Sequence, residues 1–403
     1  MKTYKKVLFI TFFAYLIYGV FISQYGMSIF PDTLNRKNPA GFYDYVGVMN
    51  VHTSQSIGTG SFDQVVSAAQ KTGLNFIFIS DLNAFKVKKQ LEKYYEKLLV
   101  FVDAEYSYLD SRLLIYGRSS YSDLNNFGQA QATISDLISK EKKSTADGIV
   151  VLAHPKKRGF RWSGPLPEGL DGIEIINLKS IWQQAWFKNK LSFIWSFLVY
   201  PFNPQLALLR LFPFPSEELQ LWDQTLKHRK MLGFAGSDAD GKLKFPKDSG
   251  IQLPSYETIF NIVRTHVLLT SELTGNVKND QRKILNALNT GHFYFSLDQL
   301  ANPKGFNALI RSAKGDFYSM GSSLPYEDNL QFVIRLAQKP LYPFDTIIYK
   351  DGKKIISTNS QETVFLIPGP GVYRIAIRVI PTFPLPDGKK WVPWIFTNPF
   401  YVN

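Results

Sequence analysis

Five residues whose side chains can bind a metal ion or transfer a proton stand at or near the ends of short apolar runs. The runs and these residues are 46–51 with His52, 76–80 with Asp81, 98–104 with Glu105, 148–153 with His154, and 231–235 with Asp238. Runs of this length are typical of buried strands, and parallel α/β barrels place their chemistry at the carboxyl ends of their strands. Because the chain has no cysteine, only His, Asp, Glu or Asn could hold a metal ion.

Each of these residues also has a structural alternative. A histidine near a strand end is often a hydrogen-bonded structural group, Asp81 could cap the next helix, and Asp238 could order its own turn. Asn50 lies two residues before His52, so both side chains would face the same side of an extended strand. The gathering of these residues at strand ends, more than any single one, favours a functional site.

The elements that must position these residues follow from hydrophobic patterning. Between Tyr45 and Phe295 the apolar runs alternate with helical patterns at 62–72, 127–140 and 217–230. This alternation predicts βαβ units in a parallel sheet or barrel. The later part of the chain instead predicts an antiparallel β-sandwich with a structural or docking role. Its strand patterns lie at 306–313, 330–336, 345–350, 354–358, 362–367, 371–380 and 391–402, with a hairpin turn at Asp351-Gly352.

The order and spacing of the strand-end motifs resemble the PHP family (polymerase and histidinol phosphatase) over roughly residues 45–295. The motifs are Asn50-Val51-His52-Thr53, Ser80-Asp81-Leu82-Asn83, Glu105, His154-Pro155 and Gly236-Ser237-Asp238-Ala239-Asp240. The resemblance implies a distorted seven-stranded β/α barrel that binds up to three ions of zinc, manganese or iron and hydrolyses phosphoesters. Clustered ions suit that reaction because they bind phosphate oxygens and acidify the attacking water.

The sequence departs from the family pattern at four positions. Asn50 stands for the first histidine of His-x-His, Ile57 for an aspartate, Leu82 for the histidine of Asp-His, and Asp240 for the last histidine of Asp-x-His. The resemblance therefore implies a reduced site with one or two ions. Its metal ligands would be His52, Glu105, His154 and Asp238, with Asn50, Asp81, Asn177 and Asp240 as weaker ones.

Two functions are consistent with this site. The first is a metal-dependent phosphoesterase with low or lost activity toward an anionic phosphoester. The second is a catalytically inactive pseudoenzyme that binds a ligand or partner at a membrane, which the apolar Ile57 and Leu82 favour. Lys156, Lys157 and Arg158 follow His154 and could bind the anionic group or form a solvated loop. No residue is assigned as a catalytic acid or base.

The N-terminal segment predicts a membrane anchor. Lys2, Lys5 and Lys6 precede a 17-residue uncharged run over 7–23, and the residues up to Pro31 are also uncharged. The run would reach about 26 Å as a helix, and a few residues of 24–30 would complete a bilayer core. Basic residues before the run favour a cytoplasmic N-terminus and an extracytoplasmic bulk of the chain. A cleaved signal peptide, which would give a secreted protein, and a buried soluble helix are the alternatives.

A hydrophobic insert at 180–222 interrupts the alternating pattern. It contains four of the seven tryptophans, and 192–209 carries no charge. Pro201 and Pro204 argue against a second spanning helix. Residues 182–214 could contact the membrane surface, or could pack internally or between copies of the chain. The expected division is an anchor and linker at 1–35, a PHP-like barrel at 36–300 and a β-sandwich at 301–403.

The charge balance narrows the choice of partners. The chain has 46 Lys+Arg against 33 Asp+Glu, a net charge of +13, which suits nucleic acid, an anionic membrane surface or an anionic substrate. We expect no nucleic-acid partner, because an exported chain does not meet the genome. With 45% hydrophobic and 15% aromatic residues, general disorder is excluded.

Overall fold

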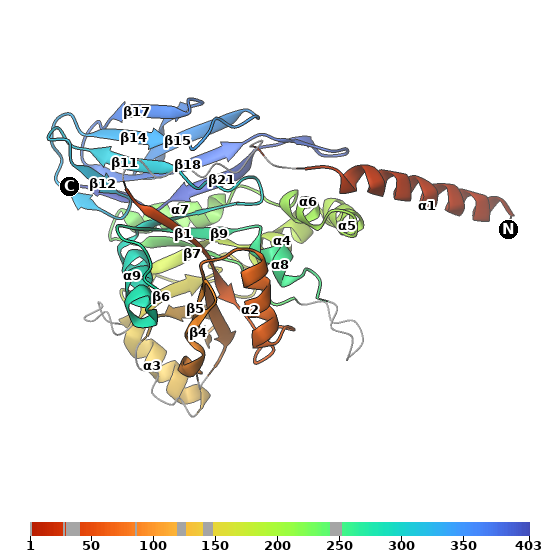
Figure 1. Cartoon of the computed structure of the whole chain (residues 1–403), viewed down its shortest axis with the longest axis horizontal. Coiled ribbons are helices and arrows are strands. Elements are labelled where there is room, and N and C mark those ends of the chain that lie inside the picture. Colours follow the sequence, from red (N-terminus) through yellow and green to blue (C-terminus); the bar gives the residue numbers. More distant parts are fainter. Residues whose placement is uncertain are drawn as a thin grey trace.

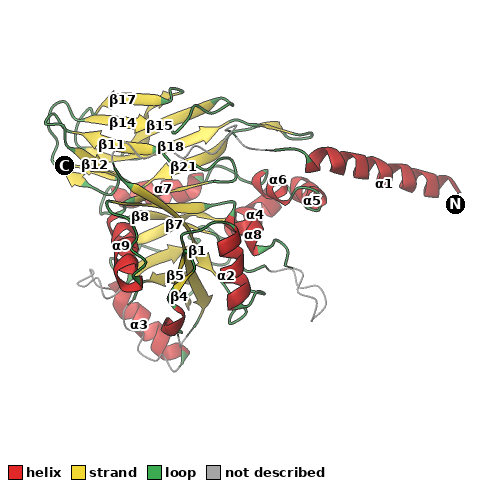
Figure 2. Ribbon diagram, viewed as in Figure 1, coloured by secondary structure: helices red, strands yellow, loops and turns green. Residues whose placement is uncertain are grey.

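The computed structural model describes residues 2–26, 29, 41–84, 87–118, 126–139, 148–241 and 252–403. The expected boundary between anchor and barrel, at residues 35 and 36, lies outside the described residues. The architecture is mixed α/β and is built around one large twisted sheet, with helices on its outer surfaces and a further layer of strands at one end (Figure 1, Figure 2).

The strands that carry the candidate site are neighbours in this sheet. They are β1 (Tyr43–Val51), β2 (Phe76–Leu82), β4 (Leu98–Tyr108), β5 (Ser111–Tyr116), β6 (Ile149–Ala153), β7 (Gly172–Asn177) and β8 (Leu232–Gly236). The pairs β1–β2, β2–β4, β6–β7 and β7–β8 are parallel, whereas β5 is antiparallel to both β4 and β6. The sequence pattern predicted six of these strands. It missed β5, so the expectation of an all-parallel sheet is wrong at that strand.

Helices cover the outside of these strands. They are α2 (Phe62–Lys71), α3 (Phe127–Ser139), α4 (Leu178–Lys188), α7 (Ser216–Leu226), α8 (Tyr256–Phe260) and α9 (Val277–Thr290), with short elements η1 (Lys89–Leu91) and β3 (Tyr94–Tyr95) beside β4. Local chemistry fixes their ends. Ser61 and Gln64 form a capping box at the start of α2, and Gly291 takes a left-handed conformation directly after α9.

The last strand of the series returns to the first. The backbone N–H of His52 donates to the carbonyl of Ala239 at 2.9 Å, and that of Ser237 donates to the carbonyl of Met49 at 2.9 Å. An isolated parallel bridge joins Val51 to Ala239. The carboxyl ends of β1 and β8 therefore meet, although they form no paired ladder within the described residues. A closed seven-stranded barrel stays a prediction.

The C-terminal strands extend the same sheet and add a second one. β9 (Arg264–Leu269) pairs with β1 and with β10 (Phe293–Ser296), and β10 pairs with β21 (Val392–Thr397). The remaining strands of the large sheet are β13 (Ser323–Leu324), β15 (Phe344–Lys350), β16 (Lys353–Thr358), β18 (Gly371–Val379) and β22 (Phe400–Val402). The second sheet has β11 (Asn307–Arg311), β12 (Phe317–Ser319), β14 (Gln331–Arg335) and β17 (Glu362–Leu366).

The two sheets of the C-terminal region pack face to face. The ring of Phe332 on β14 lies 5.5 Å from that of Tyr373 on β18 and 5.1 Å from that of Phe400 on β22. Arg374 on β18 also binds Asp223 of α7 with two hydrogen bonds, at 2.7 and 2.6 Å. The C-terminal strands therefore contact the first part of the chain in two ways, through the shared sheet and through the buried ion pair of Arg374 with Asp223. The division at residues 300 and 301 stays a prediction.

The N-terminal helix α1 (Lys2–Ser23) projects from the body of the molecule (Figure 1). Its segment Thr3–Ser23 is, within the described residues, the one helix long and apolar enough to cross a membrane, a property that signal sequences share. Within the insert, residues 190–209 form α5 (Lys190–Val199) and α6 (Pro204–Leu209), which are separated near the two prolines, as the sequence predicted. A small hairpin of β19 (Thr382–Phe383) and β20 (Gly388–Lys389) lies beside the second half of α1, where the hydroxyl of Tyr18 donates to the carbonyl of Leu385.

Candidate functional site

The four strongest ligand candidates lie together at the ends of the strands. The Nε2 atom of His52 is 3.4 Å from Oε2 of Glu105 and 3.3 Å from Oδ1 of Asp238. The Nε2 atom of His154 is 3.5 Å from Oε1 of Glu105. All four side chains are fully buried. The predicted convergence of β1, β4, β6 and β8 at one edge therefore occurs.

Sheet register and backbone conformation hold these residues in place. Glu105 lies within β4 rather than at its end, because β4 continues into the hairpin with β5, and Leu82 pairs with Glu105 across β2 and β4. Asn50, His154 and Asp238 have positive φ angles of 59°, 33° and 44°. Such conformations are uncommon for residues other than glycine and concentrate at functional sites.

The donors are of types that bind a divalent ion, and the spacing around His52 suits one. Two ligand atoms bound to one tetrahedral ion at about 2.1 Å lie about 3.4 Å apart, close to the distances that separate His52 from Glu105 and Asp238. The Nε2 atoms of His52 and His154 meet carboxylate oxygens at 3.3–3.5 Å, and within the described residues the Nδ1 atoms of both rings have no hydrogen-bond partner. Buried polar atoms without partners are rare and suit an absent ligand. In the part of the chain that the structure describes, no group of three or more His, Asp or Glu has the arrangement of a metal centre.

Three cations already occupy part of the centre. The Nζ atom of Lys179 lies 2.6 Å from Oδ1 of Asp238 and 2.9 Å from Oδ2 of Asp240. Lys157 lies 3.7 Å from Oδ2 of Asp238, and Arg112 lies 3.3 Å from Oε2 of Glu105. These three cations face Asp238, Asp240 and Glu105, so the charges of these three carboxylates are balanced without an ion. Lys179 holds Asp240, so this carboxylate is already paired with a cation and is a poor ligand for a further ion.

The pKa directions agree with this balance. Burial would lower the pKa of Lys179, but the attraction of Asp238 and Asp240 outweighs it and raises that pKa. Burial would raise the pKa of Asp238, but Lys179, the ring of His52 and Lys157 hold it well below its usual range. Asp238 is therefore a carboxylate and Lys179 an ammonium ion at neutral pH.

The weaker ligand candidates have other partners. Asp81 accepts hydrogen bonds from the N–H and hydroxyl of Thr53, both at 2.7 Å, and from the hydroxyl of Ser56 at 2.5 Å, so it orders the loop after β1. The side-chain oxygen of Asn177 caps α4 by accepting from the N–H and hydroxyl of Ser180. The amide group of Asn50 donates to Oε1 of Glu174 at 2.9 Å. Asp240 is held by Lys179.

Glu174 is a fully buried member of the centre that stands near a predicted strand end but was not assigned as a metal ligand. Its carboxylate accepts hydrogen bonds from the side chains of Asn50 and Asn177 and from the backbone N–H of His154, at 2.8–2.9 Å. Burial raises its pKa to about 7 despite these bonds and the nearby His154. A Cβ atom on Gly236 would lie 1.8 Å from Oε1 of Glu174, so this glycine makes room for the carboxylate.

Lys179 and Arg112 were also not assigned to the site from the sequence, and only Lys179 could have been noticed from its sequence position. Lys179 lies in the first turn of α4, where a cation opposes the helix dipole and needs an acidic partner. Arg112 lies on β5, the strand that the sequence pattern did not reveal.

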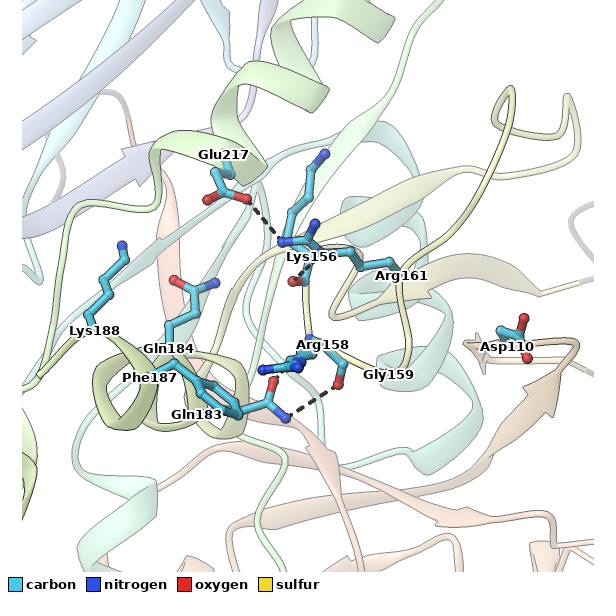
Figure 3. A pocket seen from close by; sticks show the side chains of 10 residues that line it. All are labelled: Asp110, Lys156, Arg158, Gly159, Arg161, Gln183, Gln184, Phe187, Lys188 and Glu217. Atoms are coloured by element: carbon cyan, nitrogen blue, oxygen red, sulfur yellow. Dashed lines mark hydrogen bonds and ion pairs between the residues drawn. The ribbon is translucent and has the colours of Figure 1, made fainter. Parts of the chain in front are cut away.

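The centre is closed to solvent, and the predicted substrate-binding residues divide around it. The ring of Phe160 contacts His154 at 5.4 Å, the guanidinium of Arg112 at 4.6 Å and the ammonium of Lys157 at 5.3 Å. The remaining cavity beside His154 and Glu174 has about 10 Å³, room for one water at most. Lys157 faces the centre, whereas Lys156 and Arg158 line a separate surface hollow of about 660 Å³ (Figure 3).

Comparisons with known proteins show a distant likeness to a solved structure. No protein-family model and no curated protein matches this sequence. A crystal structure of a two-domain protein from Bacteroides vulgatus, containing a predicted PHP-like metal-dependent phosphoesterase, aligns with a TM-score of 0.39 and 12% identity. The alignment covers 92% of this chain and 98% of the other.

Proposed function

We propose that this chain is a membrane-anchored phosphoesterase of the PHP type, with a reduced centre that holds one divalent ion and turns over slowly. The observation that carries the proposal is the buried imidazole of His52 between the carboxylates of Glu105 and Asp238, at distances suited to a shared ion. The order of the strand-end motifs in the sequence supports the same class of protein.

The residues at the centre would divide the work. His52, Glu105 and Asp238 would hold the ion, with His154 at the other oxygen of Glu105. A bound ion supplies acidification of water and a contact for a phosphate oxygen. Lys157 stabilises negative charge beside Asp238, and Phe160 excludes water from the centre. Since the centre is closed, the loop that carries Phe160 has to open for a substrate to enter.

A second candidate function is an inactive ligand-binding module at the membrane. The observation that favours it is the ammonium of Lys179 bound between Asp238 and Asp240, in a centre where charge is balanced without an ion. Under this second function, the polar centre would hold the strand ends together, and an anionic ligand would bind at basic residues such as Lys156 and Arg158.

One experiment separates the two functions. The full chain, purified in detergent, is analysed for bound zinc, manganese and iron and assayed with a phosphomonoester and a phosphodiester. The enzyme predicts one ion per chain and slow turnover, with both lost in Glu105→Gln. The matched control Glu362→Gln removes a carboxylate from an exposed ion pair with Arg335 and should change neither. A wild-type protein with no ion and no turnover after Mn²⁺ or Zn²⁺ addition rejects the phosphoesterase in favour of the binding module.

The anchor is a proposal with its own test. Its support is the length and hydropathy of Thr3–Ser23 and the basic residues before the apolar run. A tag placed before Met1 should remain on the protein in the membrane fraction and should be cut only by protease on the cytoplasmic side. Loss of the tag together with a soluble exported protein would show a cleaved signal peptide instead.

A further inference from the structure

Two segments far apart in the sequence, α5 and the β19–β20 hairpin, contact the second half of α1. The hydroxyl of Tyr15 donates to the carbonyl of Leu198 on α5 at 2.9 Å, and the hydroxyl of Tyr18 donates to the carbonyl of Leu385 in the β19–β20 hairpin at 2.6 Å. The ring of Tyr18 also lies 5.5 Å from that of Trp195 on α5. The helix is therefore held from both sides.

The end of α1 is fixed by the turn between α5 and α6. The amide of Asn203 donates to the carbonyls of Ile22 and Tyr25, at 3.1 and 2.9 Å, and so satisfies acceptors at the C-terminus of the helix. The ring of Phe202 packs against Tyr15 and Gly19, where a Cβ atom would lie 2.3 Å from the ring.

The two clasping segments are locked to each other. The buried guanidinium of Arg210, directly after α6, binds the carboxylate of Asp387 with two hydrogen bonds of 2.5 and 2.6 Å. The same guanidinium donates to the carbonyl of Ser192 and the hydroxyl of Ser196 on α5, both at 2.7 Å. Lys390 donates to the carbonyl of Arg210. We call α5 together with the β19–β20 hairpin the collar.

The clasp leaves too little free helix to cross a membrane. The 22 residues of α1 span about 33 Å, close to the roughly 30 Å of a bilayer core. The collar holds the helix from Tyr15 onward, so the free part, Thr3–Ala14, reaches only about 18 Å. The missing length is about 12 Å, which the collar has to supply by entering the membrane itself.

The collar has the surface that such a position requires. Leu191 and Leu385 are each 80% exposed and Phe197 is 59% exposed, although all three are apolar. The chain has no acidic residue between Lys188 and Arg210, and Lys190 lies over the ring of Trp186 at 5.5 Å. Exposed apolar side chains next to basic residues and tryptophan are typical of the interfacial layer of a membrane.

We propose that the collar inserts into the layer of the bilayer from which α1 emerges, with Leu191, Phe197 and Leu385 in contact with lipid. The partner is the lipid surface itself. The inference rests on the anchoring part of the proposed function and is independent of the chemistry at the centre. It joins a hairpin of the C-terminal strands to the anchor, so the chain is held at the membrane at three places and in a fixed orientation.

The absence of cysteine allows a direct test with single labels. Phe197→Cys and Leu385→Cys are each prepared in the full chain, carry an environment-sensitive fluorophore, and are reconstituted into vesicles of phosphatidylcholine with one quarter phosphatidylglycerol. Both labels should shift to the blue and lose most of their emission to a quencher attached near the lipid headgroup. Val364→Cys, at an exposed apolar position of β17, is the matched control and should show neither change. Phe9→Cys reports the anchor and should be quenched only by a deeper lipid quencher.

The outcomes distinguish the two proposals. Quenching of the label at 9 without quenching at 197 and 385 overturns the collar while leaving the anchor in place. An unquenched label at 9 overturns the anchor and the collar with it. Because all labelled positions are exposed, the variants should fold, and an unchanged unfolding midpoint checks this.

Discussion

Two buried histidines of this protein have opposite surroundings. His266 on β9 has a partner at each ring nitrogen, Asp44 at 2.9 Å and Asp298 at 3.1 Å, and it stacks on Tyr294 at 4.6 Å. His52 faces Glu105 and Asp238 through Nε2 alone, at 3.4 and 3.3 Å, and in the described part of the chain its Nδ1 lacks a hydrogen-bond partner. The first arrangement has a close carboxylate at each ring nitrogen, whereas the second leaves donor atoms that the proposed ion would use. The comparison teaches that burial alone does not identify a structural histidine, because both rings are fully buried and only His266 has close partners at both nitrogens.

The largest change in the free energy of unfolding should come from replacing His266, the histidine with a close carboxylate at each ring nitrogen. His266→Leu leaves Asp44 and Asp298 buried without their cation, which should lower the free energy of unfolding by about 3–5 kcal/mol. Denaturant unfolding of the full chain in detergent measures this. His228→Leu, at an exposed histidine, is the control and should change stability by less than about 0.5 kcal/mol. An equally small effect at His266 would end its assignment as a structural ion pair.

Lys179→Met should have the next largest effect and should couple stability to metal. Asp238 and Asp240 lose their closest cation, so the free energy of unfolding should fall by about 3 kcal/mol, with Lys157 still facing Asp238. Zn²⁺ or Mn²⁺ should then raise the unfolding midpoint more in the variant than in wild type, because an ion that binds only the folded state stabilises it. Lys71→Met, at an exposed ion pair, is the control. Equal metal-induced shifts in variant and wild type would show that Lys179 does not compete with an ion.

The pH dependence of stability sharpens the contrast further. Burial would lower the pKa of His266, but Asp44 and Asp298 raise it from 6.5 to about 10. A raised pKa in the folded state gives stabilisation that is fully present below the unfolded pKa of about 6.5 and is lost as the pH rises through about 10. The stability difference between wild type and His266→Leu should therefore be constant below pH 6.5 and shrink toward pH 10. Tyr294 and Arg264 lie beside the same groups and are present in both proteins, so their titration largely cancels. A difference that grows with pH would contradict the assignment.

The positions of the strand ends could be predicted from the sequence because each strand is marked by its own run of apolar residues. Apolar runs of strand length are visible in the chain, and parallel strands bring their carboxyl ends to one edge whatever the rest of the fold does. His52, Glu105, His154 and Asp238 therefore come together as expected. The break of the insert at its prolines was predictable for the same reason, since proline removes a helical hydrogen bond wherever it stands.

The rest depends on contacts between distant segments. Lys179 and Arg112 balance charges on other strands, and no local pattern states which carboxylate each one meets. Asp81 had both a capping and a ligand interpretation, and only the fold shows that its oxygens are taken by Thr53 and Ser56. The clasp on α1 by a hairpin more than three hundred residues later has no sequence signal at all.

The smallest expected change in the free energy of unfolding is at His52, and this change tests the difference between His52 and His266 most directly. The Nε2 contacts of His52 are long, its Nδ1 has no hydrogen-bond partner within the described residues, and Asp238 and Glu105 keep Lys179 and Arg112 when the ring is removed. His52→Gln should therefore change the free energy of unfolding by less than about 1 kcal/mol, far below the effect of His266→Leu. Elemental analysis of the same protein should find its bound ion gone, because two carboxylates already paired with cations do not hold a divalent ion without the imidazole. If His52→Gln is instead as destabilising as His266→Leu and the metal content is unchanged, then the His52 ring supports the strand ends, and the difference between the two histidines is one of geometry alone.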